Sequence, residues 1–179
     1  MRVFGIAGRS GSGKTTLIEK LIPLFLARSL KVSAIKHAHH DIDIDKPGKD
    51  SYRFRAVGAS EVVLLSGNRL ALMREIKNEP SPELKDALLC LSNCDLVLVE
   101  GFKNYPIPKL EVYRPSLDKP PLYPDDTSVI GIASDNPPAL PRPMSIFSVN
   151  HPETMIDFVL DHALPLKTRD DILKLNIKH

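Results

Sequence analysis

Near its N-terminus the chain reads Gly8-Arg9-Ser10-Gly11-Ser12-Gly13-Lys14-Thr15, with Thr16 directly after. This stretch matches the pattern G-x-x-x-x-G-K-[ST] at every position. The apolar run at 3–7 in front of it predicts a buried strand, and apolar residues at helical spacing behind it predict a helix over about 15–28. A strand, a glycine-rich loop and a helix in this order predict a phosphate-binding loop, the P-loop.

The residue types of this loop suit a nucleoside triphosphate and Mg²⁺. Glycines let successive backbone N–H groups turn toward one anion, and the start of the helix adds partial positive charge. Lys14 is expected to act in catalysis as a point charge on the β- and γ-phosphates, and Thr15 to offer its hydroxyl to Mg²⁺. The residues expected to bind the nucleotide are Gly8, Ser10, Gly11, Ser12, Gly13, Lys14, Thr15 and Thr16.

The composition is that of an ordinary globular protein. The chain has 179 residues, of which 42% are hydrophobic and 26% charged, with a formal net charge of +2. This balance gives no field that favours nucleic acid or a membrane surface, and no apolar run is long enough to span a bilayer. We therefore expect a cytoplasmic protein without a signal peptide, with Cys90 and Cys94 as reduced structural thiols.

Strands and helices alternate along the rest of the chain. Further strands are expected at 31–36, 96–99, 109–113, 129–133 and 145–147, and further helices near 51–57 and from about 81 and 150. This alternation predicts an α/β fold of the P-loop NTPase type, a mostly parallel sheet with helices on both faces. A hairpin at 61–74 predicts an antiparallel addition at one edge.

The same pattern predicts the domain organisation. We expect a single nucleotide-binding domain over 1–164, followed by a charged tail over 165–179 that is frayed or weakly helical. Ten of the sixteen prolines lie between Tyr105 and Pro143 and predict surface loops around two short strands rather than a domain boundary.

Two carboxylates are candidates to hold Mg²⁺ beside the P-loop. Glu100 ends the apolar strand at 96–99, and an acid in this position is the second half of a P-loop metal site. The segment 37–51 is rich in ionisable residues and follows the strand at 31–36, at the sheet edge where ligands bind. In it we favour Asp45 as a further metal ligand and as a catalytic residue that orients the attacking water.

The same segment leaves other interpretations open. His37, His39 and His40, together with Asp41 and Asp43, suit zinc or nickel in chemistry, although three histidines within four residues of an extended loop cannot easily face one ion. A merely solvated loop is the simpler alternative. Lys46 and Lys49 would then be free to meet phosphates of a substrate or partner.

Base recognition must come from outside the P-loop, because the guanine signature N-K-x-D is absent. Asp135 follows the expected strand at 129–133, and a carboxylate can accept the N1–H and amino hydrogens of guanine. Adenine offers no such donor pair. A turn residue before Asn136-Pro137 is an equally good interpretation of Asp135.

Taken together, these motifs make the chain similar to the molybdopterin-guanine dinucleotide biosynthesis protein B family over most of its length. The similarity is carried by the P-loop and by three further segments: Ile35-Lys36-His37 with His39-His40, the run from Asp43 to Tyr52 that contains D-K-P-G-K-D-S, and Leu98-Val99-Glu100-Gly101-Phe102-Lys103. The second and third segments are far more specific than the P-loop.

The resemblance implies a GTP-binding protein, weakly GTPase, that assists the guanylyltransferase attaching GMP to molybdopterin. It implies a homodimer with a shared sheet, with that guanylyltransferase and molybdopterin-handling proteins as partners. No catalytic glutamine is evident, which predicts slow turnover, and Arg9 is a candidate to act across a dimer. A metal-insertion GTPase that uses the histidine-rich segment and a small-molecule P-loop kinase stay open as alternatives.

Overall fold

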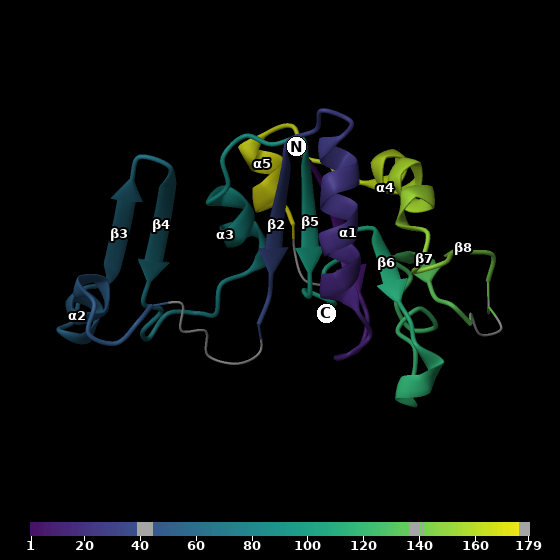
Figure 1. Cartoon of the computed structure of the whole chain (residues 1–179), viewed down its shortest axis with the longest axis horizontal. Helices are drawn as coiled ribbons and strands as arrows, with labels where there is room; N and C mark the ends of the chain where they lie inside the picture. The colour runs from purple at the N-terminus through teal and green to yellow at the C-terminus, as the bar shows by residue number, and fades with distance from the viewer. Residues whose placement is uncertain (39–44, 137–139, 141, 176–179) are drawn as a thin grey trace. The chain divides into compact units, whose positions relative to one another are not determined.

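The computed structural model describes residues 1–38, 45–136, 140 and 142–175 of the chain (Figure 1). The chain divides into two compact units, one made of Met1–His37 and Leu84–His179 and the other of Ala38–Glu83. Each unit contains its own sheet. The predicted division into one domain over 1–164 and a tail over 165–179 stays a prediction.

In the described part of the first unit, seven strands form one sheet, and six of them lie side by side in parallel. Their order is β2 (Val32–Lys36), β5 (Leu96–Glu100), β1 (Arg2–Ala7), β6 (Lys109–Val112), β7 (Val129–Ala133) and β8 (Ser145–Phe147). Because β5 and β6 flank β1, the segments that follow these three strands meet at one edge of the sheet.

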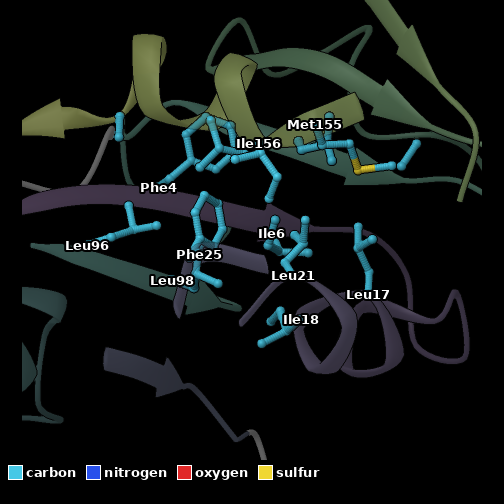
Figure 2. Close-up of a cluster of buried hydrophobic side chains, with 14 of the residues drawn as sticks. Phe4, Ile6, Leu17, Ile18, Leu21, Phe25, Leu96, Leu98, Met155 and Ile156 are labelled. Atoms are coloured by element: carbon cyan, nitrogen blue, oxygen red, sulfur yellow. The ribbon is translucent and has the colours of Figure 1, made fainter. Parts of the chain in front are cut away.

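Helices cover both faces of this sheet, as the sequence predicts. On one face α1 (Lys14–Leu26), the 3₁₀ turn η2 (Pro152–Met155) and α4 (Ile156–His162) pack with Phe4 and Ile6 of β1 (Figure 2). On the other face α3 (Leu84–Leu89) and α5 (Arg169–Leu173) pack with Val3 and Val97. Neighbouring residues of β1 point to opposite faces, so one strand supplies both cores. The mostly parallel α/β fold is confirmed.

The segment from Pro165, expected to be frayed or weakly helical, contains the five-residue helix α5 in its described part. The two-residue strand β9 (Leu164–Pro165) pairs antiparallel with the start of β1. Thr168 and Asp171 form a capping box at the start of α5. Three apolar residues of this charged segment are buried in the second core: Leu166, Ile172 and Leu175.

The second unit contains α2 (Asp50–Ala56) and a hairpin of β3 (Glu61–Ser66) and β4 (Arg69–Arg74). The predicted antiparallel hairpin is confirmed, and among the described residues it forms a two-stranded sheet of its own. One hairpin face buries Val62 and Met73. No helix in the described ranges is long and apolar enough to cross a bilayer.

Candidate functional site

The P-loop joins β1 to α1, as its sequence predicts. Gly8, Gly11 and Gly13 have φ angles of 137°, 86° and 99°, a region that residues with a Cβ rarely enter. At Gly8 there is also no room for a side chain, because a Cβ would lie 2.4 Å from the carbonyl oxygen of Val112. The loop therefore folds tightly against β6.

The backbone of this loop is arranged to receive an anion. Gly13 is the N-cap of the 13-residue α1 and offers no side chain to the free N–H groups of the first turn. Ser12 is 1% exposed, and its hydroxyl has no hydrogen-bond partner among the described residues. A buried hydroxyl without a partner is unfavourable, so both features suit a ligand rich in acceptor oxygens.

Lys14 lies at the centre of this arrangement. Its Nζ donates a 3.0 Å hydrogen bond to the carbonyl oxygen of Arg9 across the loop. Burial lowers the pKa of Lys14, the neighbouring Glu100 opposes this shift, and the charges of Lys36 and Lys119 lower the pKa further. Since phosphate oxygens stabilise an ammonium, the site favours an anion beside Lys14.

Thr15 lies in the first turn of α1, which follows β1 and the P-loop, and it meets Glu100 at the end of the neighbouring parallel strand β5. The register pairs Ile6 of β1 with Glu100 of β5, and Thr15 Oγ1 donates a 3.1 Å hydrogen bond to Oε2 of Glu100. Lys36 Nζ lies 3.7 Å from the other oxygen of Glu100.

The donor set of Thr15 and Glu100 fits Mg²⁺. This ion takes oxygen ligands at about 2.1 Å in an octahedron, so adjacent ligands lie about 3 Å apart. The hydroxyl and carboxylate oxygens are separated by 3.1 Å and therefore match two adjacent positions.

A pocket opens at the ends of β6 and β7, beside the P-loop. It is lined by Tyr113, Arg114, Pro115, Ser116, Asp135 and Asn136. The Arg114 guanidinium lies 3.4 Å from the point that a Cβ on Gly13 would occupy, which connects the pocket with the P-loop. Ser134 Oγ accepts the Asn136 N–H in the turn after β7, and the Asp135 carboxylate accepts a 3.1 Å hydrogen bond from Asn150.

Comparison with known proteins shows the family. The family model for molybdopterin guanine dinucleotide synthesis protein B, MobB, matches residues 3–135. The chain belongs to the MobB family. The curated molybdopterin-guanine dinucleotide biosynthesis adapter protein of Haemophilus influenzae is 42% identical over 157 residues, which cover 88% of this chain and 86% of that protein. The adapter protein of the same name from Escherichia coli is 41% identical over 162 residues, covering 89% and 91%.

Solved structures agree with this assignment. A crystal structure of molybdopterin-guanine biosynthesis protein B aligns with a TM-score of 0.68 and 26% identity, covering 89% of this chain and 97% of that one. Bacillus subtilis MobB aligns with a TM-score of 0.70 and 23% identity, covering 93% and 100%, and so has the same fold.

In this MobB-family chain one predicted metal ligand belongs to the unit that does not contain the P-loop. Asp45 belongs to the second unit, where its Oδ1 accepts a 2.8 Å hydrogen bond from Ser51 and its Oδ2 lies 3.3 Å from Arg55 Nε. Its role at the metal stays a prediction. The roles of Lys46 and Lys49 also stay predictions.

The histidine-rich segment is only partly described. The predicted residues His39, His40, Asp41 and Asp43 lie outside the described residues, and so does the His39-His40 part of the family resemblance. The ring of His37 stacks on Phe102, the second residue after Glu100 in the family motif V-E-G-F-K, with centroids 4.5 Å apart. Within the described ranges no three histidine, cysteine or acidic side chains group as metal ligands, and Cys90 and Cys94 are free thiols.

The segment at 115–126 carries a side chain that contacts the P-loop and that the sequence did not indicate. Lys119 Nζ donates a 3.2 Å hydrogen bond to the carbonyl oxygen of Ser10 in the P-loop. Arg9, expected as a candidate to act across a dimer, donates instead to the Pro120 carbonyl oxygen at 2.9 Å within its own chain. No motif marks Lys119, because it lies in a proline-rich stretch that predicts only loops.

Proposed function

We propose that this MobB-family chain is a GTP-binding adaptor with weak GTPase activity that assists the guanylyltransferase step of molybdopterin-guanine dinucleotide biosynthesis. The observation that carries the proposal is the pairing of Thr15 with Glu100 beside the complete P-loop. The relatives named molybdopterin-guanine dinucleotide biosynthesis adapter protein suggest the pathway and the adaptor role.

In this proposal each P-loop group has one task. The loop amides, Lys14 and the hydroxyls of Ser10, Ser12 and Thr16 hold the phosphates, and Lys14 neutralises charge that develops during hydrolysis. Thr15 and Glu100 hold Mg²⁺, which supplies charge compensation on the phosphates. Asp45 is proposed as the additional carboxylate of the metal shell or the group that orients water, with Ser51 and Arg55 fixing its two oxygens.

Guanine is the proposed base. The pocket beside Gly13 is of the kind that a base attached to P-loop phosphates would enter, and Asp135 contributes a carboxylate to its lining. Ser134 accepts the turn hydrogen bond from Asn136, so the turn does not account for Asp135. Its carboxylate is free to exchange the exposed contact with Asn150 for the N1–H and amino group of guanine.

Weak turnover is expected because no catalytic glutamine is evident in the sequence. Arg9, the arginine of the loop, donates an exposed hydrogen bond to the Pro120 carbonyl oxygen of its own chain. A GTPase without a positioned glutamine or arginine hydrolyses slowly until a partner supplies the missing group. The proposed partners are the guanylyltransferase and molybdopterin-handling proteins, so GTP acts as a switch or as a carried substrate in their complex.

A homodimer is part of the proposal, and the hairpin of the second unit supports it. Val63, Leu65, Leu70 and Leu72 share one hairpin face through cross-strand pairing, and their side chains are 57%, 77%, 65% and 48% exposed. Such an apolar face on a short hairpin indicates a partner surface. A second copy, with the same face related by a two-fold axis, covers it symmetrically.

A Mg²⁺-dependent titration of GTP against ATP tests the nucleotide assignment. GTP should bind at least about tenfold more tightly than ATP, a difference of about 1.4 kcal/mol. Asp135→Ala should remove most of this preference, whereas Asp161→Ala, an exposed acid on α4, should keep it. Equal affinity, or a preference for ATP, would overturn the guanine assignment and favour the small-molecule kinase.

A further inference from the structure

The segment at 115–126, which we call the 115–126 arch, contacts the P-loop at several points. Lys119 donates to the Ser10 carbonyl oxygen, and the Pro120 carbonyl oxygen accepts from Arg9. Leu117 lies 3.7 Å from the point that a Cβ on Gly11 would occupy. The arch therefore borders the P-loop at Arg9 to Gly11, the part of the loop that precedes the start of α1.

Two buried ionisable residues of β6 fix the C-terminal part of the arch. Glu111 is 0% exposed, and its carboxylate accepts the N–H groups of Leu122 and Tyr123 at 2.8–3.0 Å. Lys109 is 1% exposed and its Nζ lies 2.8 Å from Asp126 Oδ2. Burying charge is costly unless it is paired, so these contacts hold the arch in a defined position.

Lys119 is the side chain that this position brings to the P-loop. Glu111 and Lys109 anchor the arch that carries Lys119, but the Lys119 side chain is exposed. Among the described residues its Nζ donates one hydrogen bond, 3.2 Å long, to the neutral carbonyl oxygen of Ser10. Such a bond is worth little at the surface, so the ammonium can exchange it for a stronger acceptor at low cost.

The charges around Lys119 identify that acceptor. Lys119 Nζ lies 3.2 Å from the carbonyl oxygen of Ser10, and Lys14 Nζ lies 3.0 Å from the carbonyl oxygen of the preceding residue, Arg9. Two ammonium groups therefore lie along one stretch of the P-loop, and a third, that of Lys36, lies 3.7 Å from Glu100. Like charges at this range repel, and a ligand with several negative charges would relieve the repulsion.

We propose that Lys119 is a further ligand of the β- and γ-phosphates, which reaches the bound nucleotide in cis from the 115–126 arch. The inference rests on the proposed nucleotide binding and deepens it. Lys14 is expected on the β- and γ-phosphates, and the Nζ atoms of Lys14 and Lys119 hydrogen-bond to the carbonyl oxygens of the adjacent loop residues Arg9 and Ser10. The arch then provides a second cation in addition to Lys14.

Nucleotides of one base but different phosphate number test this inference. The Lys119→Ala variant should bind GTP about tenfold more weakly than the wild type, GDP with a smaller loss, and GMP unchanged. Lys119→Arg, which keeps the charge, should restore most of the GTP affinity. Lys20→Ala removes an exposed charge on α1 and is the matched control, with affinities like the wild type.

The outcomes separate this inference from the proposed function. Unchanged GTP affinity in Lys119→Ala, or an equal loss for GTP, GDP and GMP, would overturn the role of Lys119. If the wild type prefers ATP, the guanine assignment fails, and the same series with ATP, ADP and AMP decides the role of Lys119. Equal thermal unfolding midpoints of all variants would exclude misfolding as the cause of a loss.

Discussion

Oγ1 of Thr15 and Oε2 of Glu100 lie 3.1 Å apart and are joined by a hydrogen bond, although 85 residues separate them in the chain. Thr15 belongs to the first turn of α1, whereas Glu100 is the last residue of β5. The two meet because β1 and β5 are parallel neighbours whose carboxyl ends share one sheet edge. The two oxygens are spaced as adjacent ligands of an octahedral ion are, which is why we propose them as ligands of Mg²⁺.

Substitution of Glu100 should therefore act through the metal. Glu100→Gln keeps the shape of the side chain but removes the charge that Mg²⁺ prefers, so the Mg²⁺ concentration for half-maximal GTP binding should rise at least about tenfold. Isothermal titration at graded Mg²⁺ measures this shift. Glu19→Gln, at an exposed position of α1, is the control and should leave the Mg²⁺ dependence as it is. An unchanged Mg²⁺ requirement in Glu100→Gln would exclude Glu100 as a ligand.

Gly8 provides a test of the P-loop backbone. Gly8→Ala forces a side chain into a φ of 137° and places its Cβ 2.4 Å from the Val112 carbonyl oxygen. We expect a loss of about 3 kcal/mol in the free energy of unfolding, measured by urea denaturation. Gly67→Ala is the matched control, because no atom lies within 4 Å of its added Cβ, and it should change stability by less than about 0.5 kcal/mol. Comparable losses in both variants would contradict this explanation.

The parts of the site that the sequence predicted are those that local pattern and sheet geometry determine. The P-loop follows from its glycines, and the meeting of Thr15 with Glu100 follows from two apolar strands that end side by side. The contact of Lys119 with Ser10 spans 109 residues and has no periodic pattern. The contact depends on the position of the 115–126 arch, which Glu111 fixes. Alternation of apolar and polar residues does not predict that a charged residue such as Glu111 is 0% exposed.

Two details of the fold do not follow from the sequence. The antiparallel hairpin is predicted, but its alternating apolar residues do not say whether its strands join the parallel sheet or form a sheet of their own. In the segment after Pro165, polar residues outnumber the apolar ones, so the burial of Ile172 became evident only from its packing in the second core. Tertiary contacts, rather than propensity, determined both.

The lowered pKa of Lys14 predicts how triphosphate affinity depends on pH. Burial destabilises the ammonium in the free protein, whereas phosphate oxygens stabilise it, so binding takes up a proton when Lys14 is neutral. Affinity should be constant while Lys14 is charged and should fall as pH rises through its pKa, at a pH below the ordinary value of 10.5. Lys36 and Lys119 favour this early fall, and Glu100 opposes it.

Inorganic triphosphate with Mg²⁺ is the appropriate probe for this pH dependence, since it contains no base that titrates. Its dissociation constant should be measured from about pH 7 to pH 10, where an unperturbed lysine keeps its charge over most of the range. Lys20→Ala should follow the wild-type profile. An affinity that stays constant up to the ordinary lysine pKa would show that Lys14 titrates normally or does not contact the phosphates.

The hairpin face of the second unit gives the test of the homodimer. Leu65 is 77% exposed and lies on the same face as Val63, Leu70 and Leu72. Leu65→Lys places a charge in this apolar face, and a two-fold interface contains it twice. With about 2 kcal/mol for each copy, the dimer dissociation constant should rise about 1,000-fold in analytical ultracentrifugation. Leu173→Lys makes the same change at a side chain of α5 that is 47% exposed, and it should sediment like the wild type. Because the side chain of Leu65 is exposed, Leu65→Lys should remain folded. If the folded variant is still dimeric, the dimer interface lies on another surface.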